Sequence, residues 1–233
     1  PFLFAHEASS FPLLTSSQCK MRTRLVVWFR NDLRLADNPT LARAIALHEK
    51  VPADLLPVYC FDPRELRKTP LGSQHKMGHH RAKFRYEAVE DLRDQLRSLG
   101  SDLIIGVGKP EELLPPLLRG STPDDARAAA LLCQEHVTSE ELSVDRALRK
   151  ALPANLRFET VRSGSLYDRD LLPFAADLSN LPDGFTPFRN KVEKACTIPQ
   201  PLARPKALPP LPAALKLPAG GGLSTGALPP PAD

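Results

Sequence analysis

Short apolar runs that alternate with helix-like segments constrain the fold of this chain more than any other feature. The runs are Leu25–Phe29, Leu55–Phe61, Leu103–Val107, Ala130–Cys133 and Phe158–Val161. All but the last are apolar almost throughout, which is typical of strands buried on both faces. We therefore predict an α/β fold: a Rossmann-like five-stranded parallel sheet with helices on both faces and right-handed crossovers.

Helix start and stop signals fall between these runs. Asp37 or Asn38 is placed to cap a helix whose first turn holds a proline. Apolar side chains recur at helical spacing from Arg81 to Leu99, and Gly100 then ends that helix. Ser139 is predicted to cap a later helix, which carries two glutamates in its first turn.

Proline is concentrated at the C-terminal end, where ten of the 25 prolines fall within residues 197–233. Proline removes backbone donors and the glycine run at 220–222 adds chain entropy. We therefore predict a Pro/Gly/Ala-rich linker there, extended and solvated, after a folded domain of residues 21–196. We expect residues 1–20 to be a leader or a transit-peptide remnant, with Met21 as the candidate start.

The charge balance argues against a nucleic-acid binder that acts alone. The net charge is +4, and residues 21–196 hold 27 basic and 25 acidic side chains, which offers few phosphate contacts.

The four cysteines lie far apart, so the sequence predicts neither a zinc site nor a disulfide framework. It contains no 18-residue apolar stretch that would span a membrane. Its 42% hydrophobic content excludes wholesale disorder.

Candidate chemistry lies in the loops after the predicted strands, because ligands of parallel sheets bind at the carboxyl ends of strands. These loops are Arg30–Arg34, Asp62–Arg64, Gly106–Pro110, Gln134–Glu141 and Ser163–Tyr167. The third loop lacks the last glycine of a dinucleotide fingerprint and the Ser or Thr of a P-loop, and no GxSxG motif occurs. Histidines at 75, 79 and 80 have no carboxylate at ligand spacing, which favours a solvated loop over a metal site. The residues themselves thus indicate a binding domain without a catalytic constellation.

One long motif resembles a known family. VVWFRNDLRLADNPTL, at residues 26–41, is similar to the opening signature of the photolyase/cryptochrome family. The similarity continues through GVGKPEELLPPLL, EHVTSEELSVDRAL, SGSLYDRDLLPF and GFTPFRNKVE, so that it covers roughly residues 22–196. The pattern most resembles DASH-type cryptochromes and related plant and algal photolyase-like proteins.

The resemblance implies a light-harvesting role. The family's N-terminal α/β domain is an antenna domain that holds methenyltetrahydrofolate or a deazaflavin, and a following helical domain holds FAD and binds DNA. That helical domain is not among these 233 residues, so FAD and single-stranded DNA are expected only through it. The intact protein would receive blue light or repair cyclobutane pyrimidine dimers as a deoxyribodipyrimidine photolyase; whether this chain itself is an enzyme stays open. We expect a monomer without metal or membrane contact, while its location is unknown, with chloroplast or mitochondrion suggested by the resemblance.

The resemblance also carries over one cofactor contact. A glutamate after the fourth strand contacts the folate in folate-binding members; Glu141 is the best match and Glu140 is its neighbour. A carboxylate accepts two hydrogen bonds from the amino edge of a pterin. The alternative is that both glutamates only complement a helix dipole. Arg30 and Asp32 are further candidate ligand contacts, and the alternative for them is that they pair with each other or tie loops together. Arg162 stands where the family usually has an aromatic residue.

Two other functions remain open from the sequence. The first is a free-standing pterin-binding or adaptor α/β domain without catalysis. The second is a nucleotide-binding protein of the stress-protein type that uses residues 106–109 on ATP; the length and order of the photolyase-like motifs argue against it.

Overall fold

The computed structural model describes residues 23–51, 53–69, 72, 74–119, 127–154, 156–175, 177–213, 215, 217–218 and 222–228. The predicted leader of residues 1–20 and the candidate start at Met21 lie outside these residues.

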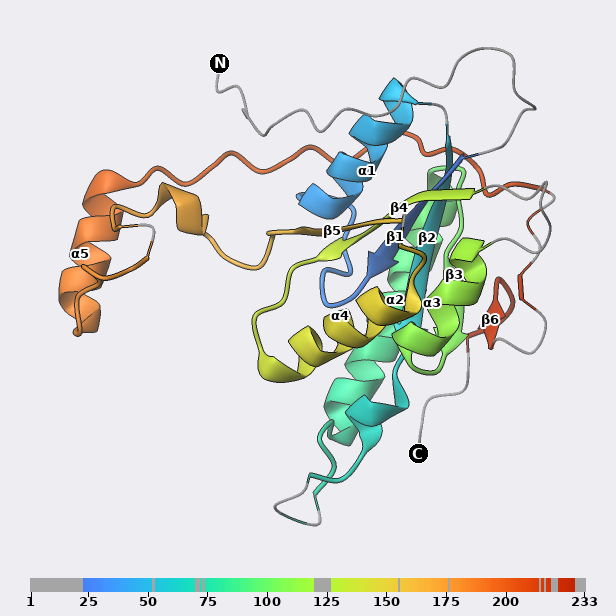
Figure 1. Cartoon of the computed structure of the whole chain (residues 1–233), viewed down its shortest axis with the longest axis horizontal. Helices are drawn as coiled ribbons and strands as arrows, with labels where there is room; N and C mark the ends of the chain where they lie inside the picture. Colours follow the sequence, from blue (N-terminus) through green and yellow to red (C-terminus); the bar gives the residue numbers. More distant parts are fainter. Residues whose placement is uncertain are drawn as a thin grey trace.

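The described residues form a six-stranded sheet of order β5-β4-β1-β2-β3-β6 (Figure 1). The strands are β1 Thr23–Phe29, β2 Ala53–Phe61, β3 Ile104–Val107, β4 Arg127–Gln134, β5 Arg157–Val161 and β6 Leu223–Ser224. The first five pair in parallel, which confirms the predicted α/β class, whereas β6 pairs antiparallel to β3. The predicted number of five strands was therefore one too few.

Helices α1 to α4 cover both faces of the sheet, as predicted. The helices of the described residues are α1 Pro39–Lys50, α2 His79–Ser98, α3 Pro110–Arg119, α4 Ser139–Ala151 and α5 Phe185–Ala195, with short 3-10 turns at Pro63–Leu66 and Arg169–Leu171. Helices α1 and α2 contribute to one hydrophobic core, and α3 and α4 to the other. Figure 1 shows α1 and α4 on opposite sides of the sheet and α5 standing apart from it.

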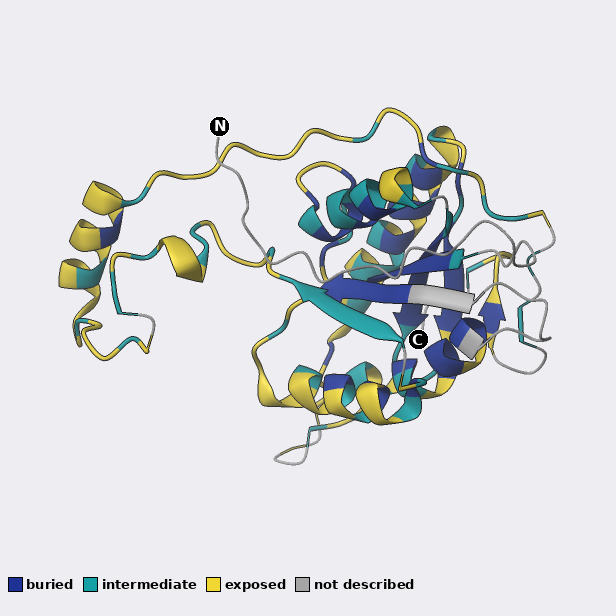
Figure 2. Cartoon of the chain, turned by 45° about the horizontal axis from the view of Figure 1, so that its top comes forward, coloured by how far each residue is buried: buried dark blue, intermediate teal, exposed yellow. Residues whose placement is uncertain are grey.

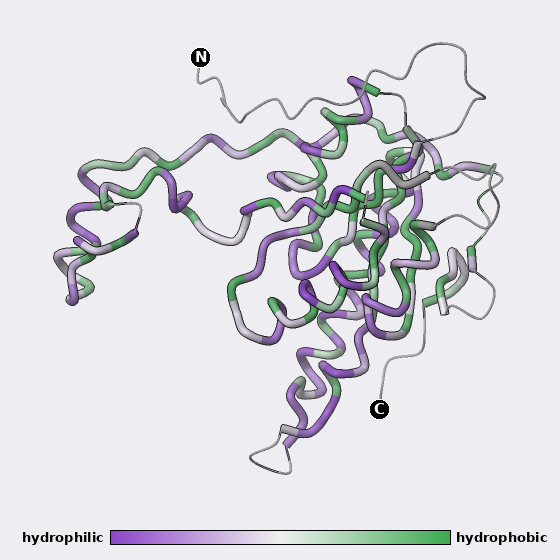
Figure 3. Tube along the Cα trace, in the orientation of Figure 1, coloured by the Kyte–Doolittle hydropathy of each residue, from purple (hydrophilic) through white to green (hydrophobic). Residues whose placement is uncertain are grey.

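The alternation of side chains along β1 explains the two cores. Leu25, Val27 and Phe29 join the core under α1 and α2, while Val26 and Trp28 join the core under α3 and α4. Successive side chains of a strand point to opposite faces, so an apolar run fills both layers. Figure 3 shows hydrophobic residues concentrated in the region of the sheet, and Figure 2 shows β5 as the half-buried strand and α5 as mostly exposed.

The helix signals are confirmed at two of the three predicted positions. Asn38 caps α1, because its side chain accepts a hydrogen bond from the Leu41 amide at 2.9 Å. Gly100 follows the end of α2 with a φ of +88°, which glycine adopts without strain. The predicted cap at Ser139 was wrong: Thr138 is the last residue with extended dihedrals, and no described side chain caps α4.

The predicted solvated linker packs on the domain. Leu208 is 6% exposed within the α1–α2 core, and its amide donates to the Leu99 carbonyl at 2.9 Å. Asp37 and Leu202 exchange two hydrogen bonds, of 2.9 and 3.0 Å. Leu223 then enters the sheet in β6. Proline limits regular structure, but it leaves the leucines between prolines free to bury apolar surface, which explains the difference.

Candidate functional site

The strand order places a topological switch point between β1 and β4. The chain leaves β1 for β2 through α1 and reaches β4 through α3, on opposite faces of the sheet. Ligands of doubly wound sheets bind outside the carboxyl ends of the strands at such a point. Arg30 follows β1 there and Gln134 ends β4, so this edge is the candidate ligand site.

Arg30 links the two strand ends to α4. Its Nη1 donates to Asp145 Oδ1 at 2.9 Å and to the Gln134 carbonyl oxygen at 3.5 Å. Its guanidinium carbon lies 4.5 Å from the centroid of the Trp28 ring. The carboxylate and the ring face offset the cost of burying a charge. Arg30 thus ties elements together, and its contact with a ligand stays a prediction.

Asp32 braces the turn after β1. Its side chain accepts the backbone N–H of Arg30 at 3.2 Å, so the two predicted residues do meet, though not as an ion pair. Its own carbonyl accepts from Asn38 Nδ2 at 3.2 Å. The residue is 2% exposed, and burial raises the pKa of its carboxyl group above the usual value while the Arg30 amide opposes that rise.

Four buried polar atoms without partners belong to residues at or beyond the carboxyl ends of β4 and β5, next to the switch point. Glu141 Oε2, His136 Nε2, Gln134 Oε1 and Ser163 Oγ are all buried, and none has a hydrogen-bond partner among the described residues. Gln134 pairs with Val161 across β4 and β5, so the residues that follow both strands lie side by side. An unsatisfied buried polar atom costs roughly 1–3 kcal/mol. These four atoms are therefore candidate contacts for a ligand or for ordered water.

The electrostatics of this group favour a ligand that donates hydrogen bonds. Burial lowers the pKa of His136 to about 4, and the charges of Arg30 and Arg85 add to the effect while Glu141 opposes it. The imidazole is therefore neutral near pH 7. The Glu141 carboxylate and the Gln134 amide oxygen only accept hydrogen bonds, whereas the Ser163 hydroxyl and the neutral imidazole can accept or donate.

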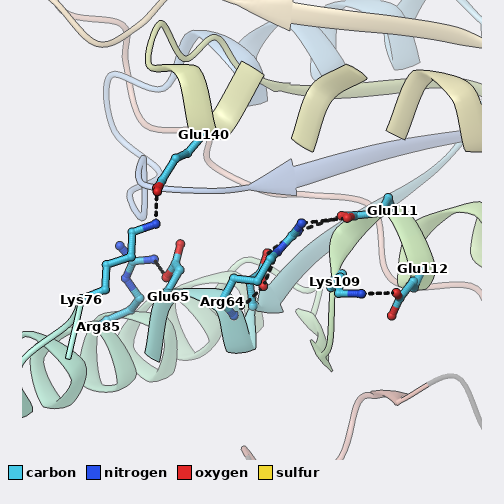
Figure 4. A network of polar contacts seen from close by, with 9 residues as sticks. Arg64, Glu65, Lys76, Arg85, Lys109, Glu111, Glu112 and Glu140 are labelled. Carbon is cyan, nitrogen blue, oxygen red and sulfur yellow. Dashed lines mark hydrogen bonds and ion pairs between the residues drawn. The ribbon is translucent and has the colours of Figure 1, made fainter. Parts of the chain in front are cut away.

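Glu140 has a different environment from Glu141. Its side chain is 65% exposed and forms an ion pair with Lys76, from the segment before α2 (Figure 4). Consecutive residues of a helix point about 100° apart, so the packing of α4 turns one glutamate outward and the other toward the switch point. The structure thus brings Glu141 into the candidate site and assigns Glu140 to a surface ion pair.

The carboxyl ends of β2 and β3 are held by further ion pairs. Arg64 Nη1 and Nη2 donate to the two carboxylate oxygens of Glu111, each at 2.8 Å, and Nη2 also donates to Asp62 at 2.6 Å (Figure 4). Arg85 pairs with Glu65 at 2.5 Å on the neighbouring surface. These contacts brace loops, which is the role expected of an arginine fork between two carboxylates.

The lysine of the loop considered for nucleotide binding forms an ion pair within α3 and its preceding turn. Lys109 Nζ lies 2.6 Å from Glu112 Oε1 in an i,i+3 pair. Arg162, the departure from the family pattern, forms ion pairs with Glu135, Asp168 and Asp170. Within the described ranges, no three His, Cys, Asp or Glu side chains gather as a metal site would require. In the same part of the chain, no helix is long and apolar enough to cross a membrane.

Sequence reasoning missed Asp145 as the partner of Arg30. The signal was present, because Asp145 follows Glu141 by four residues and so lies on the same face of a helix. The roles of Gln134 and His136 were also missed as members of the polar group. Their loop was named as a candidate, but nothing local marks which of its atoms lack partners.

Comparisons with known proteins identify relatives of the whole domain. The profile of the DNA photolyase family matches residues 25–211. A cryptochrome DASH of Gloeobacter violaceus is 44% identical over 195 residues, which are 83% of this chain and 37% of that protein. A chloroplastic/mitochondrial cryptochrome DASH of Ostreococcus tauri is 40% identical over 196 residues, 80% of this chain and 35% of that protein. The chain therefore spans just over a third of the length of these relatives.

Solved structures agree with this similarity. The crystal structure of a Synechocystis cryptochrome superposes with a TM-score of 0.75 at 32% identity, covering 86% of this chain and 40% of that one. A bacterial class III photolyase from Agrobacterium tumefaciens shares the fold, with a TM-score of 0.62 at 21% identity, over 87% of this chain and 38% of that one.

Proposed function

Because the chain belongs to the DNA photolyase family, we propose that it forms the light-harvesting antenna domain of a DASH-type cryptochrome or photolyase. The family binds a flavin and an antenna chromophore. We assign the antenna chromophore of this domain as methenyltetrahydrofolate, held at the switch point between β1 and β4.

A single observation carries this assignment: Glu141 places a buried carboxylate oxygen without a partner among the described residues at the carboxyl edge of the sheet. The amino edge of a pterin offers adjacent N–H donors, and a carboxylate accepts such a pair. A deazaflavin is the other antenna chromophore that the resemblance allows. Its pyrimidine edge carries one N–H between two carbonyl groups, which would face the Glu141 carboxylate unfavourably, so the donor-rich folate is the better match.

The other residues of the site position and polarise it. Arg30 and Asp145 fix α4 against the strand ends, and Glu141 lies one helical turn before Asp145. Neutral His136 offers a hydrogen-bonding nitrogen without a charge. When bound, the folate would absorb blue light and pass the excitation to FAD in the helical domain of the intact protein. Blue-light reception or dimer repair, with single-stranded DNA as partner through that domain, is proposed only for that intact protein.

The test is a titration of methenyltetrahydrofolate into the wild-type chain and into Glu141→Gln and Glu140→Gln. A hydrogen bond to a charged group contributes roughly 1.5–3 kcal/mol, which corresponds to about tenfold to more than a hundredfold in affinity. We expect Glu141→Gln to lose that amount and Glu140→Gln to bind nearly as wild type, with melting curves showing that both variants fold.

Equal binding by wild type and Glu141→Gln, or a larger loss at Glu140, would contradict the assignment. The titration is repeated on a full-length protein, because a second domain can close the pterin site. If neither the wild-type chain nor the wild-type full-length protein bound folate, the folate assignment would be wrong.

The rival function is a free-standing pterin-binding or adaptor domain. A transcript that stops after Asp233 would favour the rival, and one that continues into helical sequence would favour the antenna domain.

We further propose an organellar location, which rests only on relatives such as that of Ostreococcus tauri, whose name includes chloroplastic/mitochondrial. Fractionation of cells that express the tagged protein tests it, and recovery in the cytosolic fraction would contradict it.

A further inference from the structure

Residues 222–226 run along the outer edge of β3, beyond the region expected to fold. We propose that they form, together with Arg93 of α2, a latch that completes the sheet and holds the turn between β3 and α3. This inference does not depend on any ligand. It moves the end of the folded unit from Cys196 to the β3 edge.

The first component of the latch is a backbone ladder. Ser224 pairs with Ile105 and Leu223 pairs with Gly106, in antiparallel register. The Val107 amide donates to the Gly222 carbonyl at 3.3 Å. Without this segment, the outer edge of β3 would expose its backbone groups, and edges of that kind are usually paired, covered or charged.

The second component is a close steric fit around two glycines. A Cβ on Gly106 would lie 2.8 Å from methyl groups of both Leu113 and Leu223, so a larger residue there would force these side chains to shift. Leu223 is 8% exposed and belongs to the α3–α4 core. Gly222 has a φ of +67°, a conformation that glycine adopts readily, and it turns the chain into β6.

The third component is the buried guanidinium of Arg93. The side chain is 4% exposed and donates through Nε to Asp102 at 2.9 Å. Its two remaining nitrogens donate to the carbonyl oxygens of Thr225 and Gly226. A buried charge is stable only when its donors are satisfied. Release of the tail would exchange both carbonyl acceptors of the Arg93 terminal nitrogens for water, so the docked tail is what satisfies these donors within the fold.

The latch also supports the carboxyl edge of the sheet. Leu113 on α3 would contact a Cβ on Gly106, Gly108 or Gly222, which places it against both the β3–α3 turn and the tail. The same turn leads to Glu111, the partner of Arg64. Undocking the tail should therefore loosen this turn.

Amide hydrogen exchange of the full chain, measured residue by residue by NMR, tests the latch. The Val107 amide bonds the tail, whereas the Glu135 amide bonds the Val161 carbonyl of β5 at 2.8 Å, away from the β3–α3 turn, and reports on the rest of the sheet. In Leu223→Asp and Arg93→Met we expect the Val107 amide to exchange at least about tenfold faster, with a smaller change at Glu135. Equal acceleration at both amides would mean global unfolding and would contradict a local latch.

Matched controls separate the latch from general damage. Arg97→Met removes a second arginine of α2 that also contacts Asp102, but its side chain is 48% exposed. Leu166→Asp introduces the same charge at a leucine that is 64% exposed. Both should leave the Val107 amide unchanged. The proposal would be wrong if the Val107 amide exchanged no faster in Arg93→Met than in Arg97→Met, and no faster in Leu223→Asp than in Leu166→Asp.

A synthetic peptide of residues 218–228 provides a rescue experiment. Added to the Leu223→Asp protein, it should restore protection of the Val107 amide saturably, because the vacated edge of β3 can accept it. The same peptide carrying Leu223→Asp should not. Equal effects of the two peptides would overturn the assignment of this edge to the tail.

Discussion

Arg30, at the carboxyl end of β1, and Asp145, on α4, form an ion pair of 2.9 Å in which both side chains are less than a tenth exposed. The pair joins the strand at the switch point to the helix that carries Glu141. Buried ion pairs of this kind are weak stabilisers compared with apolar contacts, but they are costly to break and they define one geometry. Its consequence here is the placement of the first turn of α4.

Asp145→Ala should therefore destabilise the protein strongly. It leaves the Arg30 guanidinium buried without its carboxylate, which costs about 3–5 kcal/mol. The double variant Arg30→Met with Asp145→Ala should recover part of that loss. Asp94→Ala is the control, because Asp94 is 71% exposed and pairs with Arg97 only at 4.0 Å, so its loss should stay within about 0.5 kcal/mol. Urea unfolding measures all three, and similar losses for the two single variants would refute the prediction.

The buried imidazole of His136 should make stability depend on pH. Burial lowers its pKa from 6.5 to about 4, so the unfolded chain takes up this proton at a higher pH than the folded chain. The stability contributed by the neutral ring is complete above about pH 6.5 and is lost as the pH falls toward 4. We expect His136→Asn to show a shallower fall of melting temperature between about pH 7 and pH 4.5.

His80→Asn is the control for that experiment, because His80 is exposed at the start of α2. The melting temperature of the His80→Asn protein should depend on pH in the same way as that of the wild type. A His136→Asn curve parallel to the wild-type curve would show that His136 is not the group responsible.

Leu208 should behave as a core residue although it lies in the proline-rich tail. It is 6% exposed, so Leu208→Ala should cost about 2–5 kcal/mol through lost burial and the cavity left behind. Leu202→Ala, in the same segment but at a side chain 43% exposed, should cost no more than about 0.5 kcal/mol. Chemical denaturation of both variants checks this, and equal small losses would return the tail to a solvated linker.

The Arg64 fork should not tolerate lysine. Arg64→Lys keeps the charge but cannot donate in parallel to both oxygens of Glu111 while also reaching Asp62. Because Arg64 is partly exposed, we expect a loss of about 1–2 kcal/mol, and Arg67→Lys at an exposed neighbouring position should be neutral. Thermal melts of the two variants decide it, and a neutral Arg64→Lys would show that the fork contributes charge alone.

The sequence predicted the elements whose signals are local. The apolar runs of β1 to β4 identify buried strands because burial on both faces requires continuous hydrophobicity, and the more mixed run at 158–161 still marked β5. Asn38 and Gly100 end helices through the chemistry of single residues. β6 had no such signal, because two residues in a Pro/Gly-rich stretch show no periodicity and their pairing depends on the distant edge of β3.

Within the candidate site, the sequence by itself determined which residue types reach the carboxyl edge of the sheet. The tertiary structure alone decided what each one contacts. Arg30 pairs with Asp145 across 115 residues of sequence. The spacing from Glu141 places Asp145 on the right helix face, but it does not identify Arg30 as its partner. The packing of α4 likewise decided that Glu141 turns inward while its neighbour Glu140 meets Lys76 at the surface. The sequence determines the type and charge of each side chain, whereas the burial of that side chain and its hydrogen-bond or ion-pair partners arise only when distant elements pack together.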